Sequence, residues 1–278
     1  MFKRSFCLLA ALLTISGCQN DASTQKSENA STADIIVRAT TDLEAPAPII
    51  EATFVPNSVA TWLGYIIMIN KNADLYRSTT DSQVHLIDKG NYQSVIGLAR
   101  IKQPGVFLAV TKSGNLKAFI EADDEGNFKQ LPISISSETR LTKFCQSAVP
   151  TASQVFAITN GNVVKGFNVE ITENTSVSLG VIETGVGPTC PSLTYDQDKS
   201  IELDKATSEL LISAGRTKKT ISITNGLSIL GLTNPGYVSV TTANMGSVYR
   251  NGVILTADKD SGRIVLIARD YFVEAVTE

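Results

Sequence analysis

Short runs of apolar residues, each ended by Gly, Asn, Asp, Ser or Thr, recur along the chain beyond residue 50. Patterns with the 3.6-residue period of an amphipathic helix are nearly absent from this part of the sequence. Apolar runs of this length between turn-forming residues predict many short β-strands. The sequence therefore predicts an all-β fold.

Several segments look like copies of one β-hairpin, each with an apolar strand, a polar turn and a second strand. Asn and Gly in the turns tolerate the positive φ angles that tight hairpin turns require. A degenerate copy has strands near 201–204 and 209–213. The clear copies lie at 65–78, 106–119, 155–167 and 252–270.

The spacing of these copies predicts a β-propeller. Ile66 and Phe107 are 41 residues apart, and Phe107 and Val155 are 48 residues apart. Such a period suits four-stranded propeller blades. Residues 51–278 have room for about five to six blades of this length. A β-sandwich or a single large barrel is the alternative that hairpin similarity alone leaves open.

The first residues, MFKRSFCLLAALLTISGC, have the pattern of a secretory signal peptide. Lys3 and Arg4 precede an apolar run at 7–15 that is too short to span a bilayer as a mature helix. The segment 15–18 resembles the bacterial lipobox, which implies cleavage after residue 17 and acylation of Cys18 with diacylglycerol and a further fatty acid such as palmitate. Several acyl chains together hold a protein firmly to a membrane. An ordinary signal peptide with an incidental cysteine is the alternative.

Residues 18–50 are expected to form the lipid anchor and a flexible tether. This segment is rich in Ser, Thr, Ala, Asn and Asp and has too few large apolar groups to offset its ordering entropy. Gln19 and Asn20 replace the aspartate that favours inner-membrane retention in lipoproteins, so the cell outer membrane is the predicted location. The predicted organisation is a signal peptide at 1–17, the tether at 18–50 and a propeller at 51–278.

Charge narrows the choice of partners. The formal net charge of −3 becomes −5 once Lys3 and Arg4 are removed with the signal. The sequence shows no basic patch with interleaved aromatic residues, which argues against a nucleic-acid partner. The expected partners are the membrane, through the N-terminal lipid, and an anionic small molecule or another envelope protein.

Two cysteines, Cys145 and Cys190, remain after the signal and the lipidation site are set aside. In an exported chain these two residues favour a disulfide. Two buried free thiols acting as small hydrophobes are the alternative.

Over residues 60–272 the order of motifs resembles the β-propeller phytase family. The segment IIMINKNADLY at 66–76 is similar to that family's Ile-Ile-Gly-Thr-Asp-Lys-x-x-Gly-Leu-Tyr hairpin, and NGVILTAD at 251–258 is similar to its late Gly-x-Leu-x-Val-x-Asp strand. KFC at 143–145 and GPTC at 187–190 resemble a paired Leu-Cys and Glu-Gly-Cys of bacterial members. The resemblance implies a bridge between Cys145 and Cys190.

The family hydrolyses inositol phosphates with calcium ions that several carboxylates hold. Calcium requires about 6–8 oxygen ligands, and here the implied set is incomplete. Asn70 replaces the Asp of the hairpin, although Lys71 keeps the adjacent base, and Lys112 replaces an Arg. The acids are lost from the segment at 92–95 and from the position before Cys190, so of this implied set Asp258 alone is retained.

Other candidate groups have simpler interpretations. Asp123-Asp124-Glu125 and the segment at 258–262 are expected to be hairpin turns, and the acids at 196–204 a surface loop entering a strand. His85 is expected on an alternating strand, facing solvent or at a polar edge, and Trp62 is expected in the core. The sequence shows no established catalytic constellation and no metal-ligand spacing.

The resulting prediction is a phytase-like propeller used for binding or scaffolding, with no catalytic or metal residues assigned. A calcium-dependent phytase or related phosphoesterase with a relocated acid cluster is the alternative. Lys71 and Lys112 are predicted to bind anions together, because both follow the first strand of successive hairpins. Two solvated turn lysines with no ligand are the simpler interpretation.

Overall fold

A computed structural model describes residues 33–277 except 58, 82, 101–102, 124–125, 137–139, 150–151, 174, 188, 191 and 197–198. The predicted signal peptide and Cys18 lie outside these residues. Residues 33–278 form one compact unit. Within the described part of the chain, no helix is both long enough and apolar enough to cross a membrane.

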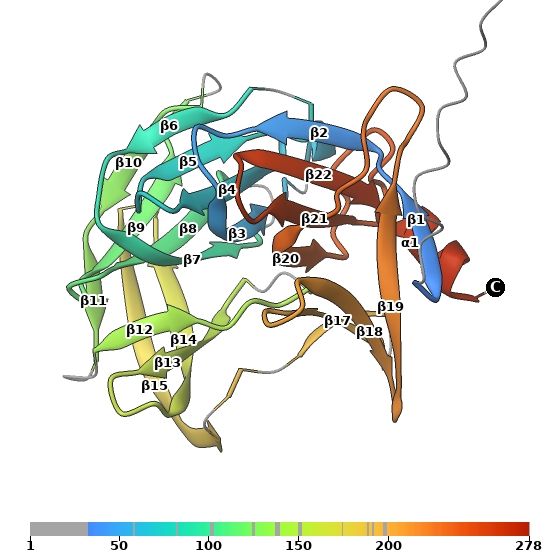
Figure 1. Cartoon of the computed structure of the whole chain (residues 1–278). Coiled ribbons are helices and arrows are strands. Elements are labelled where there is room, and N and C mark those ends of the chain that lie inside the picture. Colours follow the sequence, from blue (N-terminus) through green and yellow to red (C-terminus); the bar gives the residue numbers. More distant parts are fainter. Residues whose placement is uncertain are drawn as a thin grey trace, which may run out of the picture. The chain divides into compact units, whose positions relative to one another are not determined.

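Five sheets, antiparallel except for one parallel outer strand in each of two of them, are arranged as the blades of a β-propeller (Figure 1). Blades 1 and 2 each have four consecutive strands. They are β3 (Ile49–Val55), β4 (Tyr65–Asn70), β5 (Leu75–Ser78) and β6 (His85–Asp88), then β7 (Tyr92–Leu98), β8 (Val106–Thr111), β9 (Leu116–Glu121) and β10 (Phe128–Leu131).

Blades 3 and 4 carry an additional strand on the outer edge, and blade 5 takes its outer strand from the N-terminus. Blade 3 has β12 (Leu141–Phe144), β13 (Gln154–Thr159), β14 (Val164–Thr172), β15 (Ser176–Gly187) and the added β11 (Ile133–Ile135). Blade 4 has β16 (Leu193–Asp196), β17 (Lys199–Asp204), β18 (Glu209–Ala214), β19 (Thr217–Thr224) and the added β1 (Ile35–Arg38). Blade 5 has β20 (Pro235–Thr241), β21 (Val253–Asp258), β22 (Arg263–Ala268) and β2 (Thr41–Glu44).

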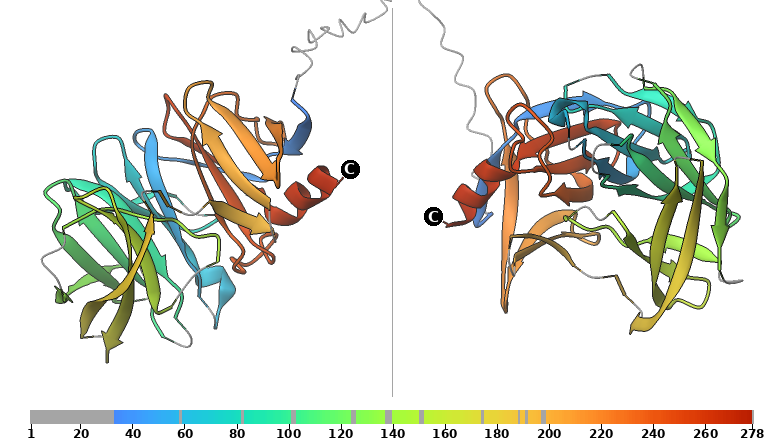
Figure 2. Two further views of the ribbon diagram at one scale, coloured as in Figure 1. Left: turned by 90° about the horizontal axis from the view of Figure 1, so that it is seen from below. Right: turned by 180° about the vertical axis from the view of Figure 1, so that it is seen from behind.

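The two short helical segments lie outside the sheets. The 3-10 helix η1 (Thr61–Leu63) lies in the connection from β3 to β4, and α1 (Arg269–Thr277) follows β22 directly. Figures 1 and 2 show α1 beside β1.

The five predicted hairpins are the second and third strands of the five blades. The segment 65–78 forms β4 and β5, and 106–119 forms β8 and β9. These strands are apolar at consecutive positions because blades pack on both of their faces: every residue of β4 and of β8 is buried. The prediction of a propeller with five to six blades is confirmed, and the number of blades is five.

The tether predicted at 18–50 includes residues that belong to the propeller. Residues 35–38 pair with β19 in parallel, and residues 41–44 pair with β22 in antiparallel register. Ile35, Val37 and Leu43 are buried there, so the N-terminal residues close two blades. The compact unit begins at Ala33.

Apolar clusters fill four of the five boundaries between blades. One cluster lies between blades 4 and 5, one between blades 5 and 1, one between blades 1 and 2 and one between blades 2 and 3. Among the described residues, no such cluster joins the strands of blade 3 to those of blade 4. The inner strands β12 and β16 of this boundary also pack on each other much less than the inner strands of the other four.

A disulfide crosses the boundary that lacks an apolar cluster. Cys145 follows β12 and Cys190 precedes β16, and their Cα atoms are 5.2 Å apart. The predicted pairing is therefore confirmed. Beyond the disulfide, the Thr242 N–H of blade 5 donates to the Ala148 carbonyl at 2.7 Å. The connection from β12 to β13 thus contacts the segment before blade 4 through the disulfide and the connection after β20 through this hydrogen bond.

Candidate functional site

The turn between the second and third strand of each blade has the same construction. The second strand ends in a polar residue whose side chain bonds to the backbone of the turn. The Asn70 Oδ1 accepts from the Asn72 N–H and the Asp74 N–H, both at 3.0 Å. This arrangement fixes the turn through contacts within its own hairpin. The residues at this position in blades 1 to 5 are Asn70, Thr111, Thr159, Asp204 and Asp258.

The residue after each of these caps is exposed. In blades 1, 2, 4 and 5 it is a lysine, and in blade 3 it is Asn160. In blades 1 and 2 its backbone N–H is bonded to the residue just before the inner strand of the same blade. The Lys71 N–H donates to the Pro48 carbonyl at 2.8 Å, and the Lys112 N–H donates to the Asn91 carbonyl at 2.6 Å. The backbone is fixed, so the lysine side chains project from one face of the propeller.

The turns of blades 1 and 2 meet at a single segment. The Tyr92 N–H donates to the Ala73 carbonyl of the first turn at 3.1 Å, while the adjacent Asn91 carbonyl accepts from Lys112. The structure therefore brings the turns that carry Lys71 and Lys112 to the same part of this face. Whether these lysines bind an anion stays a prediction.

Two further cations belong to this part of the face. Lys89 lies in the connection from β6 to β7, two residues before Asn91, and is exposed. The side chain of Arg140 covers the second turn, since a Cβ built on Gly114 would lie 2.2 Å from its Nε. Lys71, Lys89, Lys112 and Arg140 are called the cationic sector below.

The carboxylates of this face leave the cationic sector with net positive charge. Asp88 already pairs with the Lys117 Nζ at 3.3 Å and accepts from the Tyr92 hydroxyl at 2.5 Å. Asp204 and Asp258 belong to the caps of blades 4 and 5, whereas blades 1 and 2 have neutral Asn and Thr caps. Among the described residues, none of the four cations of the sector forms an ion pair.

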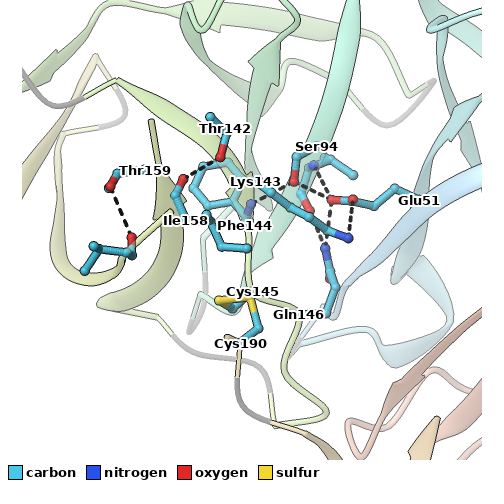
Figure 3. Close-up of a disulfide and its surroundings, with 12 residues drawn as sticks. Glu51, Ser94, Thr142, Lys143, Phe144, Cys145, Gln146, Ile158, Thr159 and Cys190 are labelled. Carbon is cyan, nitrogen blue, oxygen red and sulfur yellow. Dashed lines mark hydrogen bonds and ion pairs between the residues drawn. A yellow bond between two sulfur atoms is a disulfide. The ribbon is translucent and has the colours of Figure 1, made fainter. Parts of the chain in front are cut away.

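A second polar group lies near the axis of the propeller, around Glu51 of β3 (Figure 3). The Glu51 carboxylate accepts from the Val95 N–H at 2.9 Å and from the Ser94 hydroxyl at 2.5 Å. Gln146 donates to the same carboxylate at 3.2 Å, and the Lys143 Nζ lies 3.8 Å from its other oxygen. These partners come from blade 2 and from the inner strand of blade 3 and the segment after it.

Neighbouring inner strands are joined in the same way, by hydrogen bonds from backbone N–H groups to side chains of the preceding blade. The Thr53 hydroxyl accepts from the Gly97 N–H at 2.9 Å, and the Ser94 hydroxyl accepts from the Phe144 N–H at 2.8 Å. An inner strand is a sheet edge, and its unpaired N–H groups need partners when they are buried. Side chains of the preceding blade supply these partners.

Glu51 is therefore a structural group. Burial raises the pKa of its carboxyl, and the positive charge of Lys143 and the hydrogen bonds only partly oppose this effect. Glu51 in turn contributes to the raised pKa of the buried Tyr237 hydroxyl, for which burial is the larger cause. The carboxylate is already occupied by several donors, so its hydrogen bonds hold blades 1, 2 and 3 together.

The other acids singled out in the sequence do not converge. The Asp258 Oδ1 accepts from the N–H groups of Asp260 and Ser261, at 2.9 and 2.8 Å, as expected for a tight turn. Asp196 pairs with Lys199 and Arg269, and Glu202 pairs with Lys218. No group of three or more acidic, histidine or cysteine side chains placed to hold a metal ion occurs in the part of the chain that the structure describes.

The structure agrees with the predicted position of His85 and contradicts that of Trp62. His85 is exposed at the start of β6, the outermost strand of blade 1, as expected for a polar edge position. The expectation that Trp62 belongs to the core is wrong, because 69% of this residue is exposed. It lies in η1, which has no buried residue.

Lys205 and Lys259, the equivalents of Lys71 and Lys112 in blades 4 and 5, were not predicted as site residues from the sequence. Aligning the five hairpins at the last residue of the second strand would have found them, because that residue is Asn, Thr or Asp in every copy. Glu51 was not predicted either. No local pattern marks a side chain whose partners lie 43 to 95 residues away.

No model of a known protein family matches the sequence, and no curated protein is detectably similar to it. Among solved structures, YCF48 from Cyanidioschyzon merolae is similar with a TM-score of 0.33 and 9% identity, over 81% of this chain and 68% of that chain. A structure of YCF48 bound to D1 peptide has a TM-score of 0.41 and 10% identity, over 84% of this chain and 99% of that chain. Similarity at this level says nothing about function, and the propeller assignment rests on the sheet topology.

Proposed function

We propose that this protein is a lipid-anchored propeller of the bacterial cell envelope that binds an anionic ligand or partner through the cationic sector. The observation that carries the proposal is the convergence of the turns of blades 1 and 2 on Asn91 and Tyr92, which gathers exposed lysines without paired carboxylates. Clustered charge of one sign attracts a multivalent ion of the other sign. The anchor rests on the sequence at 13–18.

Binding without catalysis is the form that the described residues favour. A calcium-dependent phosphoesterase needs several carboxylates at one point. The described carboxylates nearest the axis and in the turns are instead held by hydrogen bonds within the protein. A phytase-like hydrolase is therefore the second candidate, supported only by the order of motifs in the sequence.

Calorimetry with inositol hexakisphosphate at low salt tests the proposal. The variant with Lys71→Ala and Lys112→Ala should bind roughly tenfold more weakly than the natural protein, as expected for the loss of two exposed charge contacts. The matched control carries Lys129→Ala and Lys219→Ala, which remove the same charge from exposed positions on the outer strands β10 and β19. The control should bind like the natural protein, and added salt should weaken binding in both.

Three results would contradict the proposal. If the natural protein does not bind inositol hexakisphosphate, the cationic sector is not a binding site. An equal loss of affinity in the control would mean that binding depends on overall charge and not on the cationic sector. Release of phosphate from inositol hexakisphosphate in the presence of calcium would replace this proposal with the hydrolase.

A further inference from the structure

A set of large apolar side chains is exposed on the connections that follow the inner strands. Trp62 is 69% exposed, and Val59 and Val149 are 70% and 64% exposed. They lie on the connections from β3 to β4, from β12 to β13 and from β20 to β21. The set is Val59, Trp62, Leu63, Val149 and Val248, called the apolar face below.

The connection from β20 to β21 contacts the other two connections, which brings the apolar face together as one surface. A Cβ built on Gly246 would lie 2.8 Å from the Cα of Trp62, and one built on Gly64 would lie 3.1 Å from the Cε of Met245. The connection that carries Val149 is tied to the third by the hydrogen bond from the Thr242 N–H to the Ala148 carbonyl. Single exposed apolar residues are ordinary, but a contiguous set with a tryptophan marks a contact surface.

The antiparallel order of strands places the apolar face opposite the cationic sector. Each inner strand begins at the turns that carry the lysines and ends at the connections of the apolar face. The second strand runs back, so its terminal turn returns to the lysine side. The two surfaces therefore lie at the two ends of the propeller axis.

The first strand of the propeller packs against a helix that begins on the side of the apolar face. The helix α1 begins at the end of β22 that lies on this side, and its Arg269 Nε donates to the Tyr195 carbonyl at the end of the inner strand β16. Phe272 of α1 lies in one apolar cluster with Ile35 and Val37 of β1. Figures 1 and 2 show β1 and α1 side by side.

We propose that the apolar face docks on the surface of the bilayer to which the protein is anchored, with Trp62 at the level of the lipid headgroups. This inference rests on the proposed anchor at Cys18. Trp and Tyr favour the membrane–water interface because they have an apolar body and a polar tip. Tyr271 of α1 is 51% exposed on the same side.

Chain length and charge fit this orientation. The 15 residues from Cys18 to Ala33 reach at most about 50 Å when extended, so the anchored lipid stays near the point where the compact unit begins. The exposed Arg250 follows Val248 on the connection from β20 to β21. A cation at this place is attracted to anionic phospholipid headgroups. The cationic sector then faces away from the membrane.

Trp62 is the single tryptophan of the chain, so its fluorescence reports on the apolar face alone. The full mature protein is mixed with vesicles of phosphatidylethanolamine and phosphatidylglycerol that contain a lipid-borne quencher. Trp62 emission should shift to shorter wavelength, be quenched by the lipid label and lose its quenching by aqueous iodide. The control carries Trp62→Phe and Leu227→Trp, which moves the reporter to an exposed position on the connection from β19 to β20, at the opposite end of the axis. The control tryptophan should stay accessible to iodide.

Flotation of the vesicles measures attachment to the membrane and so tests the lipid anchor separately from docking of the apolar face. A protein that floats with the vesicles while Trp62 stays open to iodide refutes docking and leaves the anchor supported. A protein that lacks lipid but shows lipid quenching of Trp62 supports docking and refutes the anchor. Protection of Trp62 without lipid quenching, together with a dimeric mass in light scattering, overturns the inference in favour of contact between copies. Equal behaviour of the two tryptophans also overturns it.

Discussion

Removal of the disulfide should open the boundary between blades 3 and 4 and leave the other four boundaries closed. The perturbation is the variant with Cys145→Ala and Cys190→Ala. At the other boundaries an apolar cluster holds adjacent blades together. At this boundary the bond spans residues 45 apart in sequence, and the inner strands on its two sides have little packing of their own.

The magnitude follows from the length of the closed loop. In the chain-entropy model, a loop with a sequence separation of 45 gives a stabilisation of about 4 kcal/mol at 25 °C. For a propeller of this size, a loss of that free energy should lower Tm by roughly 8–16 °C. Cys145 is buried, so its truncation to Ala adds a small packing loss.

Two measurements check this prediction. Differential scanning calorimetry gives the change in Tm, and hydrogen exchange shows where the structure opens. Exchange should accelerate more in β12 and β16 than in β3 and β7, which belong to a packed boundary. Treatment of the natural protein with a reductant should reproduce both effects, and the variant should not respond to the reductant.

The reasoning would be refuted by a fall in Tm of less than about 2 °C, well below the change that the loop length implies. An equal increase in exchange across all five blades, with no larger effect in β12 and β16, would also refute it, because it would mean that the boundary between blades 3 and 4 does not open first.

Three more predictions concern the axial carboxylate and the anchor. The free energy of unfolding of the natural protein should fall relative to that of Glu51→Gln as the pH rises above about 4.3. The reason is that burial raises the pKa of Glu51, so the folded state holds a proton that the unfolded state releases. Urea titrations at several pH values measure this difference, and parallel curves for the two proteins would contradict the prediction. Glu51→Ala should destabilise by about 1–3 kcal/mol because the buried Val95 N–H loses its acceptor. Cys18→Ser should block processing of the signal and release the chain from the detergent phase, and a variant that is processed and partitions like the natural protein would show that the lipid attachment is wrong.

The repeated part of the fold could be predicted from the sequence because its causes are local. Each second and third strand forms from an apolar run and a turn with its own capping residue, such as Asn70 or Thr111. The same is true of the approximate number of blades, which follows from the spacing of these hairpins. The pairing of Cys145 with Cys190 was predictable because few cysteines remain.

Features that depend on contacts between distant segments could not be predicted in this way. Residues 35–44 alternate polar and buried positions too briefly to be distinguished from a tether, and their partners lie in β19 and β22. Trp62 was assigned to the core on the general preference of large aromatic residues, but it lies on a short exposed helix against the connection from β20 to β21. The cationic sector required the meeting of two turns at one segment, which only the three-dimensional arrangement shows.

The position of β1 and β2 on the last two blades determines when the protein can finish folding. Ile35 pairs with Ile221 and Thr41 pairs with Leu266, so each N-terminal strand must wait for a partner near the other end of the chain. At a synthesis rate of about 5–20 residues per second, this delay amounts to roughly 10–45 s. During that time Ile35, Val37 and Leu43 have no sheet to join. Pairings of such large sequence separation slow folding, and we expect the final closure of blades 4 and 5 to be the step at which an assisting chaperone is most useful.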